Sequence, residues 1–540
     1  MSPFATLDWM VLSLYFLMVF GVAFLSGWRD RKGDTESYFL AGKNVGWFVI
    51  GASIFASNIG SEHLVGLAGA GASGGVPVAQ FEIIAAFALL LLGWLFVPFY
   101  LASGVFTMPE FLERRYSSGP RFYLAIISII GYVLTKISVT IAAGGLVFET
   151  LIGIDFWTGA VIVVVATGIY TLWGGLRAVL YTDLLQMFIL IGGSLVLTWI
   201  GLDRVGGWQG LQQSLDADYF SLWRSIDHPE FPWTGILFGA PILAVWYWCT
   251  DQFIVQRALS ARGIDEARRG ALFAAYLKQL PLFIFVLPGM IAMALVRQGQ
   301  MELGEADQAL PALVGALLPA GLTGLVAAGL LAALMSSLSS VFNSCSTIFT
   351  IDIYQKLRPA ADQRRLLLVG RLGVLAMVVF GLLWIPFMDL VSGQLFTYIQ
   401  SVQAYIAPPV AVVFLIGLLW RGANARGAVA TLIAGFVLGI GRLLLEINQT
   451  SLPPALAWFS EVNFLHFALL LFVFCSAVLV GVSLLSGGSE RGVLLSQQAH
   501  QQVLATRDPG RVRHDRILSV VLIVIIAGLW ALFSSWFLGS

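Results

Sequence analysis

A run of hydrogen-bonding side chains lies in the middle of a stretch that is otherwise long and apolar enough to cross a membrane. Residues 51–82 read GASIFASNIGSEHLVGLAGAGASGGVPVAQFE, and the polar run contains Ser57, Asn58, Gly60, Ser61, Glu62 and His63. A crossing helix needs about 20 mostly apolar residues, and non-helical backbone survives at membrane depth only where it is buried in protein or lines a cavity. The run therefore predicts a broken helix at a binding cavity. The alternative, a surface loop, is disfavoured by the apolar flanks.

Ionisable residues inside other apolar stretches point to the same cavity. They are Glu82, Lys136, Asp183, Asp251 and Lys278. Charges within a bilayer are costly, so each is a functional candidate expected to face the protein interior or water. Glu82 and Lys278 carry opposite charges on separate stretches. Asn58, His63 and Gln400 would add donors and acceptors to that pair, which suits a polyol. Lys136 is more simply explained as a charge paired for packing.

Aromatic residues could supply the apolar contact that a sugar ring needs. Trp246, Tyr247 and Trp248 interrupt a second apolar stretch, in the segment WYWCTDQ, and Phe396 precedes Gln400 by four residues. Such rings can stack on the apolar face of a sugar. They are equally typical of membrane interfaces and of protein cores. Both interpretations stay open on the sequence alone.

One helix face near residue 336 is made of small residues with hydroxyl groups. Ala333, Ser336, Ser337 and Ser340 recur at i, i+3, i+4 and i+7, so they share a face. A face of small residues is typical of close helix packing. The alternative is cation binding, because serine hydroxyls opposite the carbonyls freed at the first break would offer a hard monovalent ion only oxygen ligands.

The composition requires many helices to position these residues. The chain has 540 residues, of which 58% are hydrophobic and 11% charged, so it is predicted to be an all-α multi-pass membrane protein. We expect about 14 membrane-spanning helices, two of them centred near residues 167 and 191. If the N-terminus is outside, most Lys and Arg residues fall in inward-facing loops, including the segment with Arg257, Arg268 and Arg269. Both termini are then outside, and the net charge of +0 favours no nucleic-acid partner.

The two interrupted stretches lie five spans apart, which predicts two inverted repeats of five helices. Paired broken helices are a strong sequence indication of a transporter site between such repeats. The predicted organisation is an extra helix and cytoplasmic loop at 1–46, a first repeat at 47–202, an extracellular loop at 203–232, a second repeat at 233–420, and three further helices at 421–540, with a cytoplasmic loop at 487–516.

The sequence resembles the sodium/solute symporter family, and within it the sodium/glucose cotransporters, over nearly its whole length. The most specific segments are SNIGSEHLVGLAGAGA at 57–72, GGLRAVLYTDLLQ at 174–186, WYWCTDQFIVQRALSA at 246–261, LMSSLSSVFNSCSTIFTIDIY at 334–354 and GQLFTYIQS at 393–401. The resemblance implies a LeuT-like 5+5 inverted-repeat core, alternating access, and import of a glucose-like or galactose-like hexose driven by sodium across the plasma (inner) membrane.

The resemblance also implies roles for individual residues. The sugar contacts would be Asn58, His63, Glu82, Lys278 and Gln400, with Tyr247 and Trp248 closing the inner side and Phe81 and Phe396 the outer side. The main sodium site would use the backbone carbonyls of Ala56, Ile59 and Ala333 with the hydroxyls of Ser336 and Ser337. A second sodium site would use Asp183, Ser339 and Ser340. Alternatively, Asp183 would be only a helix N-terminal charge.

Two departures from the family pattern leave the substrate open. Ala244 stands where relatives carry a polar residue able to reach the sugar, and Thr397 stands where glucose cotransporters often carry an acid. Mannose, fructose and myo-inositol therefore remain alternatives to glucose and galactose.

Three classes of function can be compared on the sequence. A membrane enzyme would need a metal cluster or an activated nucleophile, and the sequence shows neither, so we expect no enzyme activity and no cofactor, with Na⁺ as the only metal ion. A sugar-gated sensor or ion leak would keep the same binding residues and is not separated from a transporter by sequence. The oligomeric state is likewise open.

Overall fold

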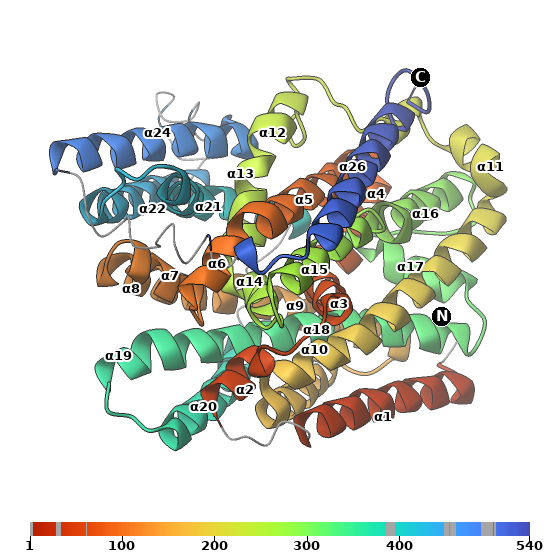
Figure 1. The fold of residues 1–540 in the computed structure, drawn as a ribbon. Helices are drawn as coiled ribbons and strands as arrows, with labels where there is room; N and C mark the ends of the chain where they lie inside the picture. Colours follow the sequence, from red (N-terminus) through yellow and green to blue (C-terminus); the bar gives the residue numbers. More distant parts are fainter. Residues whose placement is uncertain are drawn as a thin grey trace.

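The structure, a computed structural model, describes residues 4–28, 34–60, 62–384, 395–447, 453, 459, 461–487, 501 and 504–539. Regular structure in these ranges is helical, and the extended pairings consist of two isolated bridges. Figure 1 shows the helices packed around α18 (Leu322–Ile348), which runs through the middle of the bundle and is almost entirely buried. The predicted all-α fold is confirmed.

The helices follow one another along the chain with short connections. Up to residue 214 they are α1 (Thr6–Trp28), α2 (Thr35–Leu40), α3 (Trp47–Asn58), η2 (Glu62–Leu67), α4 (Ala68–Gly74), α5 (Gln80–Leu91), α6 (Val97–Ser103), α7 (Met108–Arg115), α8 (Ser118–Gly131), η5 (Tyr132–Ile137), α9 (Ser138–Val147), α10 (Phe156–Val205) and α11 (Gly207–Ser214). After residue 232 they are α12 (Trp233–Phe238), α13 (Ala240–Ala244), η8 (Val245–Thr250), α14 (Gln252–Leu259), α15 (Ile264–Leu277), α16 (Leu287–Arg297), α17 (Ala309–Leu317), α18, η11 (Phe349–Tyr354), α19 (Gln355–Leu357), α20 (Gln363–Trp384), α21 (Leu395–Leu419), α22 (Ala425–Ile447), α24 (Phe464–Leu485) and α26 (Pro509–Leu532).

Membrane-length helices account for most of the chain. In the described residues, 12 helices are long and apolar enough to cross a membrane. One of them, α10, has 50 residues and is interrupted at Gly175, whose φ of 55° and ψ of −154° are not helical. At about 1.5 Å per residue, this helix is too long for one crossing of a hydrocarbon core about 30 Å thick. It therefore covers both spans predicted near residues 167 and 191, and α3 with η2 and α4 covers the broken span.

Both predicted breaks are confirmed. Helix α3 ends at Asn58, Ile59 is extended with φ −71° and ψ 103°, and the helix resumes at Glu62. Further along the chain, η8 ends at Thr250, Asp251 is extended with φ −76° and ψ 128°, and α14 begins at Gln252. The carboxylate of Asp251 caps α14 by accepting the N–H of Phe253 at 3.1 Å. Each break exposes backbone groups to the centre of the bundle.

The first helix is fastened to the N-terminus of α18. Asp8 of α1 is buried, and its Oδ1 accepts the backbone N–H groups of Gly321 at 2.6 Å and Gly324 at 2.7 Å. These N–H groups belong to the first turn of α18, where no earlier carbonyl can accept them. The carboxylate of α1 therefore caps α18 and fixes its position along the bundle.

The last helix is fastened to α15 and α5 instead. The carboxylate of Asp515 on α26 is buried and accepts from Arg268 at 2.9 Å and from Arg269 at 3.0 Å, both on α15. At the other end of α26, Trp530 Nε1 donates to Gln80 Oε1 of α5 at 2.8 Å. The sequence prediction had placed both arginines in a loop. In the structure they lie on α15, and their pairing with Asp515 lets this helix pack against α26.

Candidate functional site

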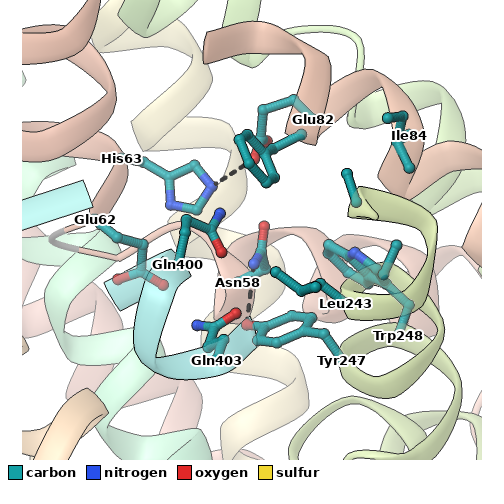
Figure 2. A pocket seen from close by; sticks show the side chains of 13 residues that line it. Asn58, Glu62, His63, Glu82, Ile84, Leu243, Tyr247, Trp248, Gln400 and Gln403 are labelled. Atoms are coloured by element: carbon teal, nitrogen blue, oxygen red, sulfur yellow. Dashed lines mark hydrogen bonds and ion pairs between the residues drawn. The ribbon is translucent and has the colours of Figure 1, made fainter. Parts of the chain in front are cut away.

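A small cavity of about 60 Å³, partly open to solvent, lies where the first break meets α5, α13, η8 and α21. Its lining combines carboxylates, amides and an imidazole with aromatic rings (Figure 2). The lining residues are Asn58, Glu62, His63, Phe81, Glu82, Ile84, Ala240, Leu243, Ala244, Tyr247, Trp248, Gln400 and Gln403. A concave site with a few convergent polar groups among apolar side chains is typical of small-molecule binding.

Glu82 and Lys278 form the predicted ion pair. The pair contacts Asn58, which precedes the break, and His63, which follows it. The ammonium of Lys278 makes an ion pair with Glu82 and donates to Asn58 Oδ1 at 2.6 Å. The second oxygen of Glu82 lies 3.2 Å from His63 Nε2, and Asn58 Nδ2 donates to the Tyr247 hydroxyl at 3.0 Å. A buried charge is tolerated only when it is paired and hydrogen-bonded. Lys278 does not line the cavity; it holds Glu82 and Asn58 at its wall.

The structure gathers most of the predicted sugar contacts. Phe81, Tyr247, Trp248 and Gln400 line the cavity together with Asn58, His63 and Glu82. The ring of Phe81 stacks on that of Phe464 at 6.5 Å, which gives the cavity an aromatic cover. The side chain of Phe396 lies outside the described residues.

Several lining residues were not predicted. Glu62 and Gln403 are the polar ones, and Ile84, Ala240 and Leu243 are apolar. A signal for Gln403 existed, because it follows Gln400 by three residues and so shares its helix face. Glu62 had been recognised only as a helix breaker beside His63.

Lys136 also reaches the cavity wall. Its ammonium donates to the Tyr247 hydroxyl at 2.7 Å and lies 4.2 Å from the centre of that ring and 4.1 Å from that of Phe253. A cation over aromatic faces is stabilised by their electron density. The expected structural role agrees with these contacts, although the contact with Tyr247 places Lys136 next to the cavity.

A loop residue is positioned to influence the aromatic cover. His228 Nδ1 accepts the backbone N–H groups of Glu230 at 3.2 Å and Phe231 at 3.0 Å, and its ring stacks on Phe231. Phe231 in turn meets Phe81 edge-on at 6.1 Å. Burial and the guanidinium of Arg224 lower the pKa of His228. The loop is therefore ordered around a neutral imidazole.

Acidification on the side of this loop should weaken binding in the cavity below the aromatic cover. Protonation of Nδ1 removes the acceptor of both N–H groups, so this contribution is present above the ordinary histidine pKa of about 6.5 and is lost as the pH falls through the lowered pKa. His228→Asn keeps an acceptor that does not titrate in this range, so ligand binding in its cavity should change less between pH 7.5 and pH 5. An equal pH dependence in both proteins would contradict this role for His228.

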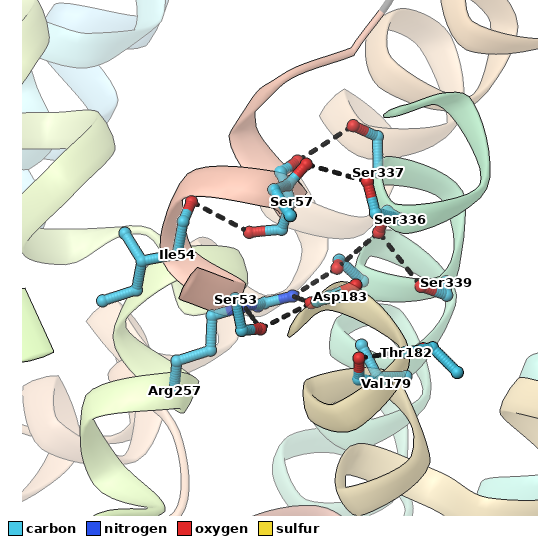
Figure 3. A network of polar contacts seen from close by, with 12 residues as sticks. Ser53, Ile54, Ser57, Val179, Thr182, Asp183, Arg257, Ser336, Ser337 and Ser339 are labelled. Atoms are coloured by element: carbon cyan, nitrogen blue, oxygen red, sulfur yellow. Dashed lines mark hydrogen bonds and ion pairs between the residues drawn. The ribbon is translucent and has the colours of Figure 1, made fainter. Parts of the chain in front are cut away.

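The predicted main sodium ligands also come together, and Figure 3 shows Ser336 and Ser337 facing the end of α3. The Ser336 hydroxyl lies 2.8 Å from the Ala56 carbonyl and 2.9 Å from that of Ala333. The Ser337 hydroxyl lies 3.1 Å from the Ile59 carbonyl. The break at Ile59 leaves the carbonyls of Ala56 and Ile59 without helical partners, so neutral oxygens converge between the end of α3 and α18. This donor set fits a hard monovalent cation.

The predicted second sodium residues are arranged differently from the expectation. Asp183 accepts from Ser53 and pairs with Arg257 at 3.3 Å, and Arg257 also donates to Ser340 (Figure 3). The Ser339 hydroxyl donates to the Ser336 carbonyl at 3.0 Å. Arg257, predicted to lie in an inward-facing loop, is buried on α14. Asp183 Oδ1 has no hydrogen-bond partner in the part of the chain that the structure describes.

Solved structures with the same arrangement show the fold. The chain superposes with a TM-score of 0.80 on an outward-open, substrate-bound Na⁺-coupled sialic acid symporter, at 22% identity, covering 91% of this chain and 100% of that one. Mhp1, a nucleobase-cation-symport-1 family transporter in a closed conformation, gives a TM-score of 0.55 at 16% identity, covering 86% and 97%. These likenesses show that the chain has a LeuT-like fold with an inverted-repeat core.

Sequence relatives then identify the family. The sodium:solute symporter family model matches residues 38–435, and the chain belongs to that family. It is 40% identical over 516 residues to sodium/glucose cotransporter 4 of Danio rerio, covering 88% of this chain and 78% of that protein. It is 42% identical over 503 residues to sodium/myo-inositol cotransporter 2 of Mus musculus, covering 86% and 74%. The protein is thus a multi-pass, sodium-coupled symporter and not an enzyme.

Proposed function

We propose that this symporter imports a glucose-like or galactose-like hexose with sodium by alternating access. The observation that carries the proposal is the cavity in which Asn58, His63, Glu82 and Gln400 converge beside Tyr247 and Trp248. Carboxylate and amide groups suit the hydroxyls of a sugar, and the rings suit its apolar face. The names of the sodium/glucose relatives support the hexose, and those of the sodium/myo-inositol relatives support myo-inositol as the alternative.

In this proposal the residues act in three groups. Asn58, His63, Glu82 and Gln400 bind the sugar, with Lys278 holding the Glu82 carboxylate. Tyr247 and Trp248 close the inner side, and Phe81 and Phe396 the outer side. The carbonyls of Ala56, Ile59 and Ala333 and the hydroxyls of Ser336 and Ser337 bind the main sodium ion. The repeats span 47–202 and 233–420, and the protein lies in the plasma (inner) membrane with both termini outside.

Exchange in proteoliposomes tests this function. Labelled D-glucose, D-galactose, D-mannose, D-fructose and myo-inositol should be compared, and sodium should drive accumulation of the substrate. At 100 mV the movement of one charge supplies about 2.3 kcal/mol, enough for roughly a 40-fold gradient per coupled ion. Unchanged accumulation in potassium or choline would reject sodium coupling. Sugar binding without exchange would identify a sensor.

We also propose a coupling ratio of two sodium ions per sugar. Asp183 has one oxygen without a described partner, and Ser339 and Ser340 lie one turn beyond the main-site serines. The ratio of inward charge to labelled sugar should be near two. It should fall towards one in Asp183→Asn, because the neutral amide leaves the positive charge of Arg257 uncompensated beside the second site. A ratio near one in the unaltered protein would reject the second ion.

A further inference from the structure

Glu62 places a second carboxylate in the cavity wall, away from Glu82. Figure 2 shows Glu62 at the left, below His63, with Glu82 at the top and Gln403 and Tyr247 at the bottom. Glu62 is half-buried at the point where the helix resumes after the break. Among the residues that the structure describes, its carboxylate makes no hydrogen bond and no ion pair.

The cations near the cavity are engaged by other groups. The ammonium of Lys278 forms an ion pair with Glu82 and a hydrogen bond with Asn58, so the charge of Glu82 is compensated. The ammonium of Lys136 donates to Tyr247 and lies over two aromatic rings. The lining itself contains no lysine or arginine. Glu62 therefore contributes a negative charge that no described cation contacts directly, and Lys136 and Lys278 offset it only at longer range.

The carboxylate of Glu62 also adjoins the sodium ligands. A Cβ added at Gly60 would lie 2.7 Å from Glu62 Oε2 and 2.9 Å from Ser337 Oγ, so the carboxylate and the hydroxyl flank the same glycine. Ser337 faces the carbonyls exposed at the break. A sodium ion held there would be a close neighbour of Glu62 without needing to be its direct ligand.

We propose that Glu62 couples the two sites, because a sodium ion beside Ser337 offsets the charge that Glu62 exposes to the sugar cavity. This inference rests on the proposed function. A sugar that enters the cavity displaces the water around the Glu62 carboxylate, and burial of a charge without a direct counter-ion is unfavourable. Sodium binding supplies the counter-charge first, so the sugar then binds more tightly.

The size of the effect depends on screening. Two unit charges about 6 Å apart attract with an energy equivalent to about a 3-fold change in affinity in water, and to about 100-fold at an effective dielectric constant of about 20. For a half-buried carboxylate we expect a value between these limits, about 10-fold.

Equilibrium binding to the full-length protein in nanodiscs tests the proposal. The dissociation constants of D-glucose and myo-inositol should be measured in saturating sodium and in choline. In the unaltered protein sodium should tighten binding. In Glu62→Gln this enhancement should fall about 10-fold, mainly because binding in choline improves, and sodium affinity should weaken. Glu62→Asp keeps the charge and should keep most of the enhancement, as should Glu36→Gln, which changes a carboxylate that pairs with Lys43 outside the cavity.

The outcomes separate this inference from the function on which it rests. If neither compound binds the unaltered protein, or if sodium has no effect on it, the proposed function fails. If sodium acts on the unaltered protein but equally on Glu62→Gln, the coupling role of Glu62 is rejected. It is also rejected if Glu62→Gln loses binding equally in sodium and in choline, since Glu62 would then act only as a sugar contact.

Discussion

Replacement of Glu82 by alanine is expected to weaken sugar binding by about 10- to 100-fold and to lower the stability of the protein. The change removes a hydrogen-bonding carboxylate, worth about 1.5 to 3 kcal/mol. It also leaves the fully buried ammonium of Lys278 without its counter-ion, and breaking a buried pair typically costs about 3 to 5 kcal/mol. Gln400→Ala removes one neutral cavity group and should weaken binding by about 10-fold, at 1.4 kcal/mol per tenfold. Binding of labelled sugar to purified protein measures both effects.

A paired variant separates sugar contact from folding. Glu82→Gln with Lys278→Met removes both charges, so it should restore the thermal stability lost in Glu82→Ala while sugar binding stays weak. If Glu82→Ala and Gln400→Ala both bind sugar with unchanged affinity, the sugar site lies elsewhere.

Removal of the two hydroxyls that face the break should raise the sodium concentration needed for half-maximal uptake by at least 10-fold. The double variant Ser336→Ala, Ser337→Ala removes both hydroxyl ligands from the proposed sodium site and leaves only the backbone carbonyls. Each lost contact is worth about 1 kcal/mol. Sodium-dependent uptake at constant ionic strength gives the half-saturation value.

A serine on another face of the same helix provides the control. The Ser346 hydroxyl donates to the Gly370 carbonyl at 2.6 Å, away from α3, so Ser346→Ala should leave sodium affinity near that of the unaltered protein. Equal sodium dependence in the double variant and in the Ser346→Ala control would remove Ser336 and Ser337 from the sodium site.

Features that depend on local sequence were predictable. The break after Asn58 followed from polar residues at membrane depth, and Ser336 and Ser337 followed from their helical spacing. The partner of Asp183 was not predictable in this way. Arg257 lies 74 positions away, next to a run that looked like a charged loop, and only the tertiary packing of α14 against α10 and α18 brings it to Asp183.

The lining of the cavity shows a similar limit. The opposite charges of Glu82 and Lys278 allowed the sequence to predict that they pair. The sequence does not show that Glu82 lines the cavity whereas Lys278 lies outside its lining. That distinction depends on the short distance from its ammonium to Asn58. The role of Glu62 likewise depends on a tertiary contact, because its carboxylate and the Ser337 hydroxyl both lie close to Gly60.

The two terminal helices are joined to different halves of the working machinery. Asp8 attaches α1 to α18, which carries the sodium-facing serines, whereas Asp515 and Trp530 attach α26 to α15 and α5, which carry Lys278 and Glu82. If these halves rock against each other during transport, α1 and α26 must travel with opposite partners. Helix α1 would then move with the rigid body that contains α18, and α26 with the rigid body that contains α15 and α5. Labels placed on α1 and on α26 would report the rocking motion without touching either binding site.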